Sequence, residues 1–322
     1  MRIVRSTLVA VATALAPAAA AQDYPSRQVT IVVPFAAGGS VDIVGRLVAQ
    51  KLTERLGKPF VVENRPGAGT VTATTAVAKS APDGHTLLFA PSGTFAINPT
   101  LYKQLAYDPL NDLTMVALVT RDPLVLVVNP SLPVNSVADL VKYAKDNPGK
   151  VSFAATGPGT SLTLLGELLK TVAKIDIVSV NYRGGAQGLQ DVIAGQVHMM
   201  FSDPASGIVQ AQAGKVRALG VSSATRLPVA PDVPTIAESG LPFAIESWEM
   251  LAAPAGTPAP IVTRINAELR AVMALPDIQQ QLIARGQVPV VSPPPEQLAA
   301  FVKTEMQRWG DIVRASGQAG SL

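Results

Sequence analysis

Gly38 and Gly39 follow an apolar run at residues 29–33 and precede apolar residues with helical spacing. This is the first segment of the chain whose residue types and spacing suit ligand binding. Glycines can take positive φ and leave the backbone uncovered, and the first N–H groups of a helix that starts near Ser40 have no acceptor within that helix. Free N–H groups and the helix dipole together favour an anion. Residues 35–42 therefore predict an anion-binding loop; the alternative is that the two glycines only make a tight turn.

A second copy of this pattern lies further along the chain. The apolar run 151–155 is followed by Gly157 and Gly159 and then by apolar residues that share one helical face. Each copy is followed by another strand-like run and another glycine loop, at residues 64–69 and 181–185. Because open α/β sheets bind ligands at the carboxyl ends of their strands, the repeat predicts two α/β lobes with a ligand held between them.

Other side chains could complete such a site. Ser92 and Thr94 follow a strand-like run, and their hydroxyls either face a ligand or cap a short helix. Arg183 either pairs with a carboxylate or stays in solvent. Asp42 and Asp203 either accept a hydrogen bond from a ligand or only stabilise a helix N-terminus. The predicted ligand-binding residues are Phe35, Ala37, Gly38, Gly39, Asp42, Ser92, Thr94, Thr156, Gly157, Gly159, Thr160, Ser161, Tyr182, Arg183, Gly184 and Asp203.

The composition restricts the classes of protein that the chain can belong to. With 322 residues, 48% hydrophobic and 15% charged, the chain can bury two sizeable cores and is not of disordered composition. The absence of cysteine excludes disulfides, thiolate metal sites and cysteine nucleophiles. Aromatic residues are only 5% of the chain, which disfavours a sugar-binding groove or a base-stacking platform.

The N-terminal residues read as a secretory signal peptide. Arg2 and Arg5 precede an apolar stretch at residues 8–15, and the alanines at 18–21 supply a cleavage site, so we expect cleavage after about Ala21 and a periplasmic protein. The alternative is a retained membrane anchor. Without the two arginines the net charge falls from +3 to +1, and we expect no nucleic-acid partner.

Catalytic and cofactor motifs are missing. No G-x-S-x-G surrounds Ser92, Ser161 or Ser206, and His85 and His198 lack the spacing of a metal site. The glycine pairs lack the third glycine of a dinucleotide-binding loop. We therefore expect no enzyme, no metal and no cofactor.

The order of strand-like and helical patterns suggests where the chain passes between lobes. We expect a signal peptide at residues 1–21, lobe 1 at residues 22–123 plus 246–322, and lobe 2 at residues 124–245, with the ligand cleft between the lobes. The three helical patterns that end the chain have no strands of their own between them. We expect these helices to pack on lobe 1.

Several quoted segments resemble one known family in order along the chain. They are YPSRQVTIVVPFAAGGSVD at 24–42, ENRPGAG at 63–69, PDGHTLL at 82–88, NYRGG at 181–185, GQV at 195–197 and PAGTP at 254–258. The chain resembles the Bug (Bordetella uptake gene) family, the periplasmic substrate-binding proteins of tripartite tricarboxylate transporters. The resemblance covers almost all of residues 24–317.

The resemblance implies a two-lobed periplasmic binding protein of the Venus flytrap, type II-like, α/β fold, in which each lobe is a mixed β-sheet flanked by helices. It also implies that residues 35–42 and 156–163 hold a ligand carboxylate, mostly through backbone groups and ordered waters. Ala37 and Thr163 depart from the common proline and histidine of the family. The two departures keep the expected carboxylate-binding loops, but they leave open the shape of the distal end of the pocket and therefore which ligand is bound.

From the resemblance and the residues together we expect a monomeric receptor that delivers a small carboxylate to the membrane subunits of such a transporter. The expected ligands are dicarboxylates, tricarboxylates, aromatic carboxylates and acidic amino acids. One alternative is a secreted enzyme on the same scaffold, for which Asp42 and Asp203 are the pair to nominate. Another is a ligand sensor for a signalling partner.

Overall fold

The computed structural model describes residues 24–322. The predicted signal peptide lies outside the described residues. Within residues 24–322, the structure has no helix that is long and apolar enough to cross a membrane.

The first of two sheets has six strands in the order β11-β4-β10-β3-β1-β2. The strands are β1 (Val29–Val33), β2 (Phe60–Asn64), β3 (Thr86–Pro91), β4 (Leu113–Asp122), β10 (Ser247–Pro254) and β11 (Val288–Pro289). β1 pairs in parallel with β2 and β3, while β10 runs antiparallel between β3 and β4. The central strands are apolar on both faces because helices cover both sides.

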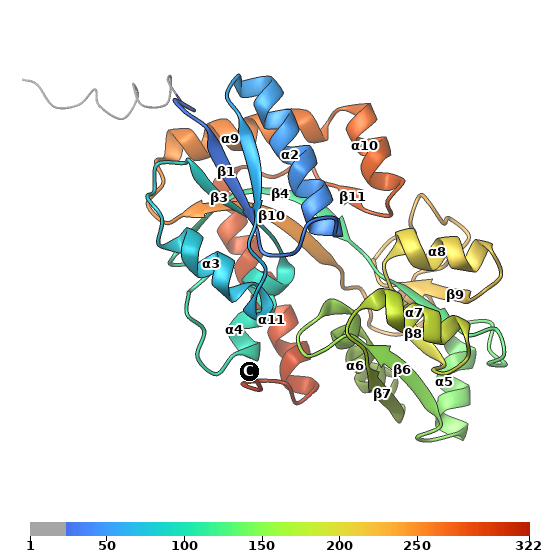
Figure 1. Cartoon of the computed structure of the whole chain (residues 1–322). Helices are drawn as coiled ribbons and strands as arrows, with labels where there is room; N and C mark the ends of the chain where they lie inside the picture. The colour runs from blue at the N-terminus through green and yellow to red at the C-terminus, as the bar shows by residue number, and fades with distance from the viewer. Residues whose placement is uncertain (1–23) are drawn as a thin grey trace, which may run out of the picture.

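Helices cover the two faces of this sheet (Figure 1). One face buries its side chains against α2 (Ser40–Leu56), α9 (Ala259–Met273) and α10 (Pro276–Ile283). The other face is covered by the remaining helices of lobe 1. These are η1 (Ala68–Thr70), α3 (Val71–Ala78), η2 (Gly93–Ile97), α4 (Asn98–Leu101) and α11 (Pro295–Ala315).

The second sheet has five strands in the order β7-β6-β8-β5-β9. The strands are β5 (Val125–Val128), β6 (Val151–Ala155), β7 (Ile177–Asn181), β8 (Met199–Ser202) and β9 (Arg217–Val221). β6 is parallel to β7 and β8, and β5 is antiparallel to β8 and β9. The helices around it are α5 (Val137–Asp146), α6 (Ser161–Ala173), α7 (Gly185–Ile193), α8 (Pro204–Gln212) and η3 (Ile236–Ser239).

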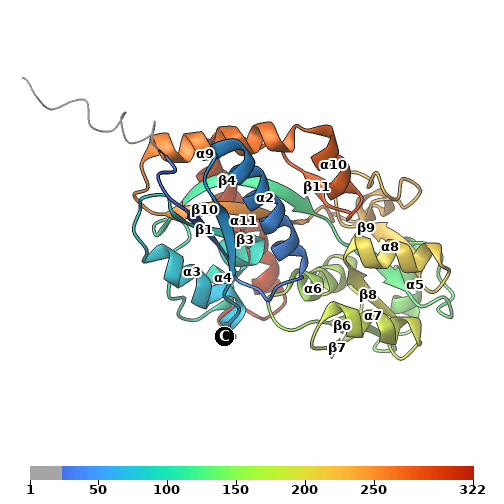
Figure 2. The same ribbon diagram turned by 45° about the horizontal axis from the view of Figure 1, so that its top comes forward.

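The two mixed sheets lie in two lobes, as Figures 1 and 2 show, and the predicted two-lobed α/β fold is confirmed. The chain leaves the first sheet at the end of β4, enters the second at β5, and returns at β10. We use the predicted limits, 22–123 plus 246–322 and 124–245, to define lobe 1 and lobe 2 below.

α8 is a helix that the sequence analysis did not identify. Asp203 is its N-cap residue and Pro204 occupies its first position, which is a common way to begin a helix. The apolar spacing of this helix is weak, because its buried face consists of Pro204, Gly207 and Ile208 while Val209 is exposed. The Asp-Pro pair was the signal that could have located it.

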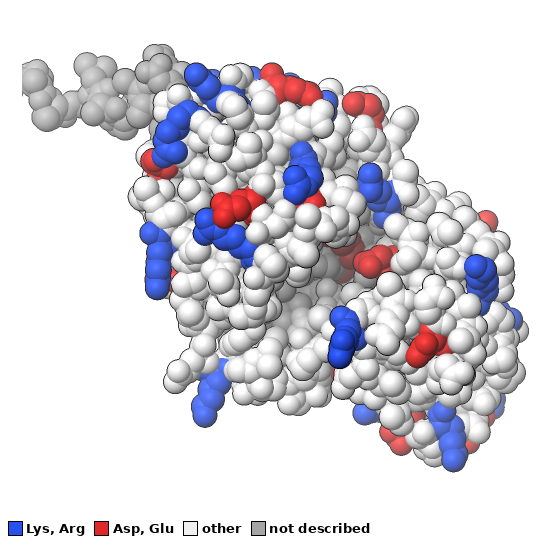
Figure 3. All heavy atoms as spheres, in the orientation of Figure 1, with Lys and Arg blue, Asp and Glu red and all other residues white. Residues whose placement is uncertain are grey.

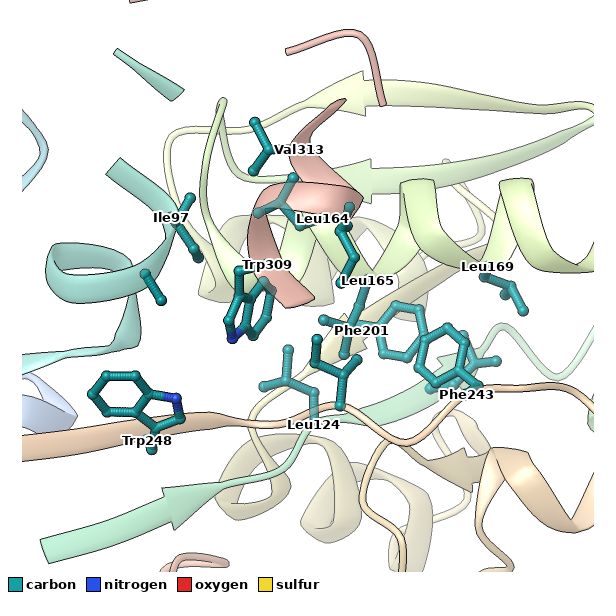
Figure 4. Close-up of a cluster of buried hydrophobic side chains, with 14 of the residues drawn as sticks. Ile97, Leu124, Leu164, Leu165, Leu169, Phe201, Phe243, Trp248, Trp309 and Val313 are labelled. Carbon is teal, nitrogen blue, oxygen red and sulfur yellow. The ribbon is translucent and has the colours of Figure 1, made fainter. Parts of the chain in front are cut away.

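The last helix packs on lobe 1, as expected for the terminal helices, and it also contacts lobe 2. α11 packs on β4, η2 and α4 of lobe 1 and on α6 of lobe 2. Figure 4 shows Trp309 and Val313 of this helix beside Leu164 and Leu165. Buried side chains therefore form one continuous apolar cluster that runs from lobe 1 into lobe 2.

Candidate functional site

The first predicted loop connects β1 to α2 and is fixed by one buried carboxylate. Asp42 accepts hydrogen bonds from Gly38 N at 2.8 Å, Arg46 Nε at 2.9 Å and Asn64 Nδ2 at 2.8 Å. Asn64 also donates to the Phe35 carbonyl at 3.0 Å. Burial raises the pKa of Asp42, but the hydrogen bonds from Arg46, Gly38 and Asn64 outweigh it and lower the pKa below its ordinary value.

These contacts divide the loop into a supporting part and an exposed part. Asp42 is only 2% exposed, so it holds the loop and presents no oxygen to the cleft. Residues 35–40 are exposed, and Gly38 takes a φ of +89°, which favours glycine. The Ala37 N–H donates no hydrogen bond within residues 24–322.

The second predicted loop connects β6 to α6 and is closed by two threonines. Thr156 N donates to Thr163 Oγ1 at 2.8 Å, and the side chain of Thr160 caps α6 by accepting from Thr163 N. Thr160 Oγ1 also donates to the Gly157 carbonyl at 3.1 Å. Thr163 is 5% exposed. The residue that replaces the common histidine of the family therefore supports the loop from inside.

The tip of the second loop touches lobe 1. Gly159 N donates to Gln318 Oε1 at 3.0 Å, and the side chain of Leu101 lies where a Cβ on Gly159 would be. Gly157 and Gly159 have φ of +100° and +71°. Sequence reasoning did not find Gln318, because no pattern marks a single glutamine near the end of the chain as a partner of a loop 159 positions earlier.

The two loops face each other across a hollow between the lobes. In Figures 1 and 2 the β1–α2 loop and the β6–α6 loop approach from opposite sides, and Figure 3 shows the surface hollowed between them. A cavity of about 300 Å³ lies where the hollow meets both lobes. It is lined by Ser40, Ile43, Asp122, Pro123, Asp203, Pro204, Ala205, Ser206, Arg285, Gly286 and Gln287.

Three carboxyl groups lie near this cavity. Burial, together with the charges of Asp203 and Glu246, raises the pKa of Asp122 to about 7, although hydrogen bonds from Gln287 and Thr120 oppose the shift. Burial and the charge of Asp122 raise the pKa of Glu249. Desolvation also raises the pKa of Asp203. Of the predicted site residues, Asp203 is the one that lines the cavity.

Ser92 and Thr94, which were predicted as ligand contacts, make hydrogen bonds inside lobe 1 in this structure. Both are fully buried. Ser92 Oγ shares a hydrogen bond with Ser247 Oγ at 2.8 Å, and Thr94 Oγ1 donates to Thr70 Oγ1 at 2.9 Å. Neither caps a helix through its side chain. They lie at the end of β3 as predicted, but the chain folds over them and uses the hydroxyls internally.

Tyr182, Arg183 and Gly184 connect β7 to α7. The Tyr182 hydroxyl donates to Asp191 Oδ2 at 2.9 Å, and burial raises its pKa. Gly184 is the N-cap residue of α7. Arg183 is exposed and has no ion-pair partner within the described part of the chain.

The arrangement is suited to binding an anion and does not assemble the nominated catalytic pair. Asp42 is used by its own loop, whereas Asp203 lies on the cavity wall. Among residues 24–322, no group of three or more histidine, aspartate or glutamate side chains is placed to hold a metal ion. The loops instead provide backbone N–H groups at the N-termini of α2 and α6.

Known proteins match almost the whole chain. The family model "Tripartite tricarboxylate transporter family receptor" (TctC) matches residues 44–318. Protein BugT of Bordetella pertussis is 37% identical, with 95% of each chain covered.

Two solved structures are similar in fold and sequence. The R. palustris protein Rpa4515, solved with adipate, has a TM-score of 0.81 and 37% identity, covering 92% of this chain and 99% of its own. MatC from Rhodopseudomonas palustris, solved with bound malate, has a TM-score of 0.75 and 37% identity, covering 90% of this chain and all of its own. The chain therefore belongs to the TctC family of tripartite tricarboxylate transporter receptors, the family of the Bug proteins.

Proposed function

We propose that this protein is a non-catalytic periplasmic receptor that captures a small carboxylate between its lobes and delivers it to the membrane subunits of a tripartite tricarboxylate transporter. The observation that carries the proposal is the pair of glycine loops facing each other across one hollow, each at the N-terminus of a helix. Adipate and malate, which are named with the two similar structures, are both dicarboxylates. That chemistry supports a dicarboxylate as the first ligand to test.

We assign different roles to the predicted residues. Free backbone N–H groups in the two loops hold one carboxylate, because amides without a partner at a helix N-terminus favour negative charge. They belong to Ala37, Gly39, Ser40, Gly157, Thr160 and Ser161, since Gly38 N and Gly159 N already donate to Asp42 and Gln318 and Pro158 has no N–H. Arg183, which is exposed and unpaired within residues 24–322, supplies a cation for a second carboxylate. Asp42 and Thr163 position the loops, and Asp203 lines the inner wall.

Lobe closure would trap the ligand, because the loops belong to different lobes and a ligand that contacts both stabilises the arrangement in which they are close. Catalysis is not needed for this role. A receptor needs amides, hydroxyls and a shaped wall, whereas an enzyme needs titratable groups that converge on the ligand.

The test is a thermal-shift panel of adipate, malate, citrate, benzoate and glutamate, followed by calorimetry on each compound that raises Tm. A ligand that binds only the folded protein must raise Tm. We expect at least one dicarboxylate to do so. If none does and an ester or amide is turned over instead, the enzyme alternative replaces the receptor.

Arg183→Ala tests the assignment of the second carboxylate. We expect it to weaken binding of a dicarboxylate by tenfold or more and to leave a monocarboxylate almost unaffected. Arg270→Ala is the matched control, because Arg270 is also exposed but lies in the last turn of α9. Equal losses in both variants would show a general charge effect and contradict the assignment.

A further inference from the structure

The end of α11 directs Gln318 away from the helix. Gly317 has a φ of +72°, and its N–H donates to the Arg314 carbonyl at 3.0 Å. Gln318 N donates to the Val313 carbonyl at 3.1 Å. These two bonds form a glycine-based helix stop, which fixes the direction in which residue 318 leaves the helix.

The residues that follow are tied to lobe 1. Gly320 N donates to the Thr100 carbonyl at 3.1 Å, and Lys103 N donates to the Leu322 carbonyl at 2.8 Å. Leu322 N donates to the Leu101 carbonyl at 3.3 Å. Gln318 is therefore held on both sides, by the helix before it and by pairing with residues 100–103 after it.

This anchored side chain reaches the ligand loop of the opposite lobe. Gln318 Oε1 accepts from Gly159 N at 3.0 Å. A Cβ on Gly159 would lie 2.1 Å from Leu101 Cδ2, so Leu101 packs directly against the same residue. One polar and one apolar contact from lobe 1 thus meet at one glycine of lobe 2.

The rest of the loop shows why such a support matters. Its base is fixed by Thr156, Thr160 and Thr163 through hydrogen bonds within the loop. Its tip contains Gly157 and Gly159, both at positive φ, and glycine loses more conformational freedom on ordering than any other residue. Within residues 24–322, the Gly159 N–H donates to the side chain of Gln318.

We propose that Gln318 is a positioning residue of the ligand site: its carboxamide, delivered by the C-terminal segment, orders the tip of the β6–α6 loop before the carboxylate binds. This inference rests on the proposed function, which supplies the ligand. It adds residues 313–322 to the residues that shape the ligand site. A loop that is already ordered spends less of the binding free energy on its own immobilisation. Loss of Gln318 therefore weakens binding.

The experiment compares Gln318→Ala and Gln318→Met with the wild type. Methionine keeps an unbranched side chain of similar length without the carbonyl acceptor, so it separates the hydrogen bond from packing. Gln307→Ala is the matched control, because Gln307 is an exposed glutamine of α11, the helix that precedes Gln318, and its side chain makes no hydrogen bond in the described residues. Hydrogen exchange of residues 156–161 is measured without ligand, and the affinities for adipate and malate are measured by calorimetry.

We expect faster exchange of residues 156–161 in both Gln318 variants and no change in Gln307→Ala. We expect affinity to fall about fivefold, which corresponds to one neutral hydrogen bond of about 1 kcal/mol. A change in Tm alone, with exchange and affinity unchanged, would mean a merely structural contact and would overturn the proposal.

Higher affinity in the Gln318 variants would also overturn the proposal, because it would make the carboxamide a competitor of the ligand. If neither adipate nor malate binds any form of the protein, the choice of ligand in the proposed function fails. The exchange measurement then still decides whether Gln318 orders the loop.

Discussion

Gly38 donates its backbone N–H to Asp42 Oδ2 at 2.8 Å, so the loop at the start of α2 is closed by a carboxylate from the first turn of its own helix. Arg46 and Asn64 bond the same carboxylate. The loop therefore keeps its shape without a ligand, and Asp42 controls that shape from below the surface.

Asp42→Ala should reduce both ligand affinity and stability. Removing the carboxylate leaves Gly38, Arg46 and Asn64 without their acceptor, and we expect the free energy of unfolding to fall by about 2 kcal/mol. Affinity should fall by tenfold or more because the loop loses its shape. Urea denaturation and calorimetry measure the two effects. Asp277→Ala, at an exposed acidic residue in the first turn of α10, should leave affinity unchanged and lower the free energy of unfolding by only about 0.5 kcal/mol; losses like those of Asp42→Ala would contradict this account.

Asp122→Asn should stabilise the protein at alkaline pH and not at acidic pH. The pKa of Asp122 is raised to about 7, so the folded protein holds its proton where the unfolded chain has lost it. The stability that Asp122 contributes is fully present below about pH 4 and is lost as the pH rises through 7, where the buried carboxyl group ionises. Asparagine has no proton to lose, so the variant keeps its stability over this range.

The measurement is Tm for both proteins from pH 4 to pH 8.5. The difference between Asp122→Asn and the wild type should be near zero at pH 4 and should grow to several degrees in favour of the variant at pH 8. A difference that stays constant with pH would show that the carboxyl does not titrate in this range.

Gly286→Ala should keep the lobes apart. Gly286 belongs to the α10–β11 connection of lobe 1, and a Cβ there would lie 2.3 Å from Pro204 Cβ of lobe 2. We expect ligand affinity to fall by tenfold or more. Gly57→Ala is the matched control, since Gly57 has a similar positive φ of 72° but no atom within 4 Å of an added Cβ. Its cost is limited to backbone strain of about 1 kcal/mol, so calorimetry should show unchanged affinity for this variant.

Trp309 should report lobe movement through its fluorescence. The chain contains two tryptophans, and both are buried. Trp248 is fixed within lobe 1 by a hydrogen bond from Nε1 to Glu305 Oε2 at 3.0 Å and by stacking on Phe95. Trp309 lies beside lobe 2, and its Nε1 has no partner in the described residues.

We therefore expect a ligand-dependent change in emission that survives in Trp248→Phe and disappears in Trp309→Phe. The affinity of each variant for the same ligand, measured by calorimetry, controls for damage to the site. If the change in emission disappeared in Trp248→Phe and survived in Trp309→Phe, the movement would lie within lobe 1.

Strands and loop positions could be predicted from local sequence, whereas side-chain roles could not. The apolar runs at 29–33 and 151–155 and the glycines after them placed β1, β6 and both loops. The burial of Ser92 and Thr94 could not be predicted, because a residue at the end of a strand can still be covered by the chain that follows. Gln318 and Leu101 reach Gly159 through tertiary contacts that leave no local pattern.

The position of β10 between β3 and β4 has a consequence for the order of folding. The pairs that join β10 to β3 and β4, such as Trp248 with Arg121, connect residues far apart in the sequence, so the centre of this sheet stays open until residue 254 is available. The strands of the other sheet all lie within residues 125–221. As the chain is synthesised from its N-terminus, the middle of the chain can therefore form its sheet first. The edges of β3 and β4 stay unpaired until β10 is available to lie between them.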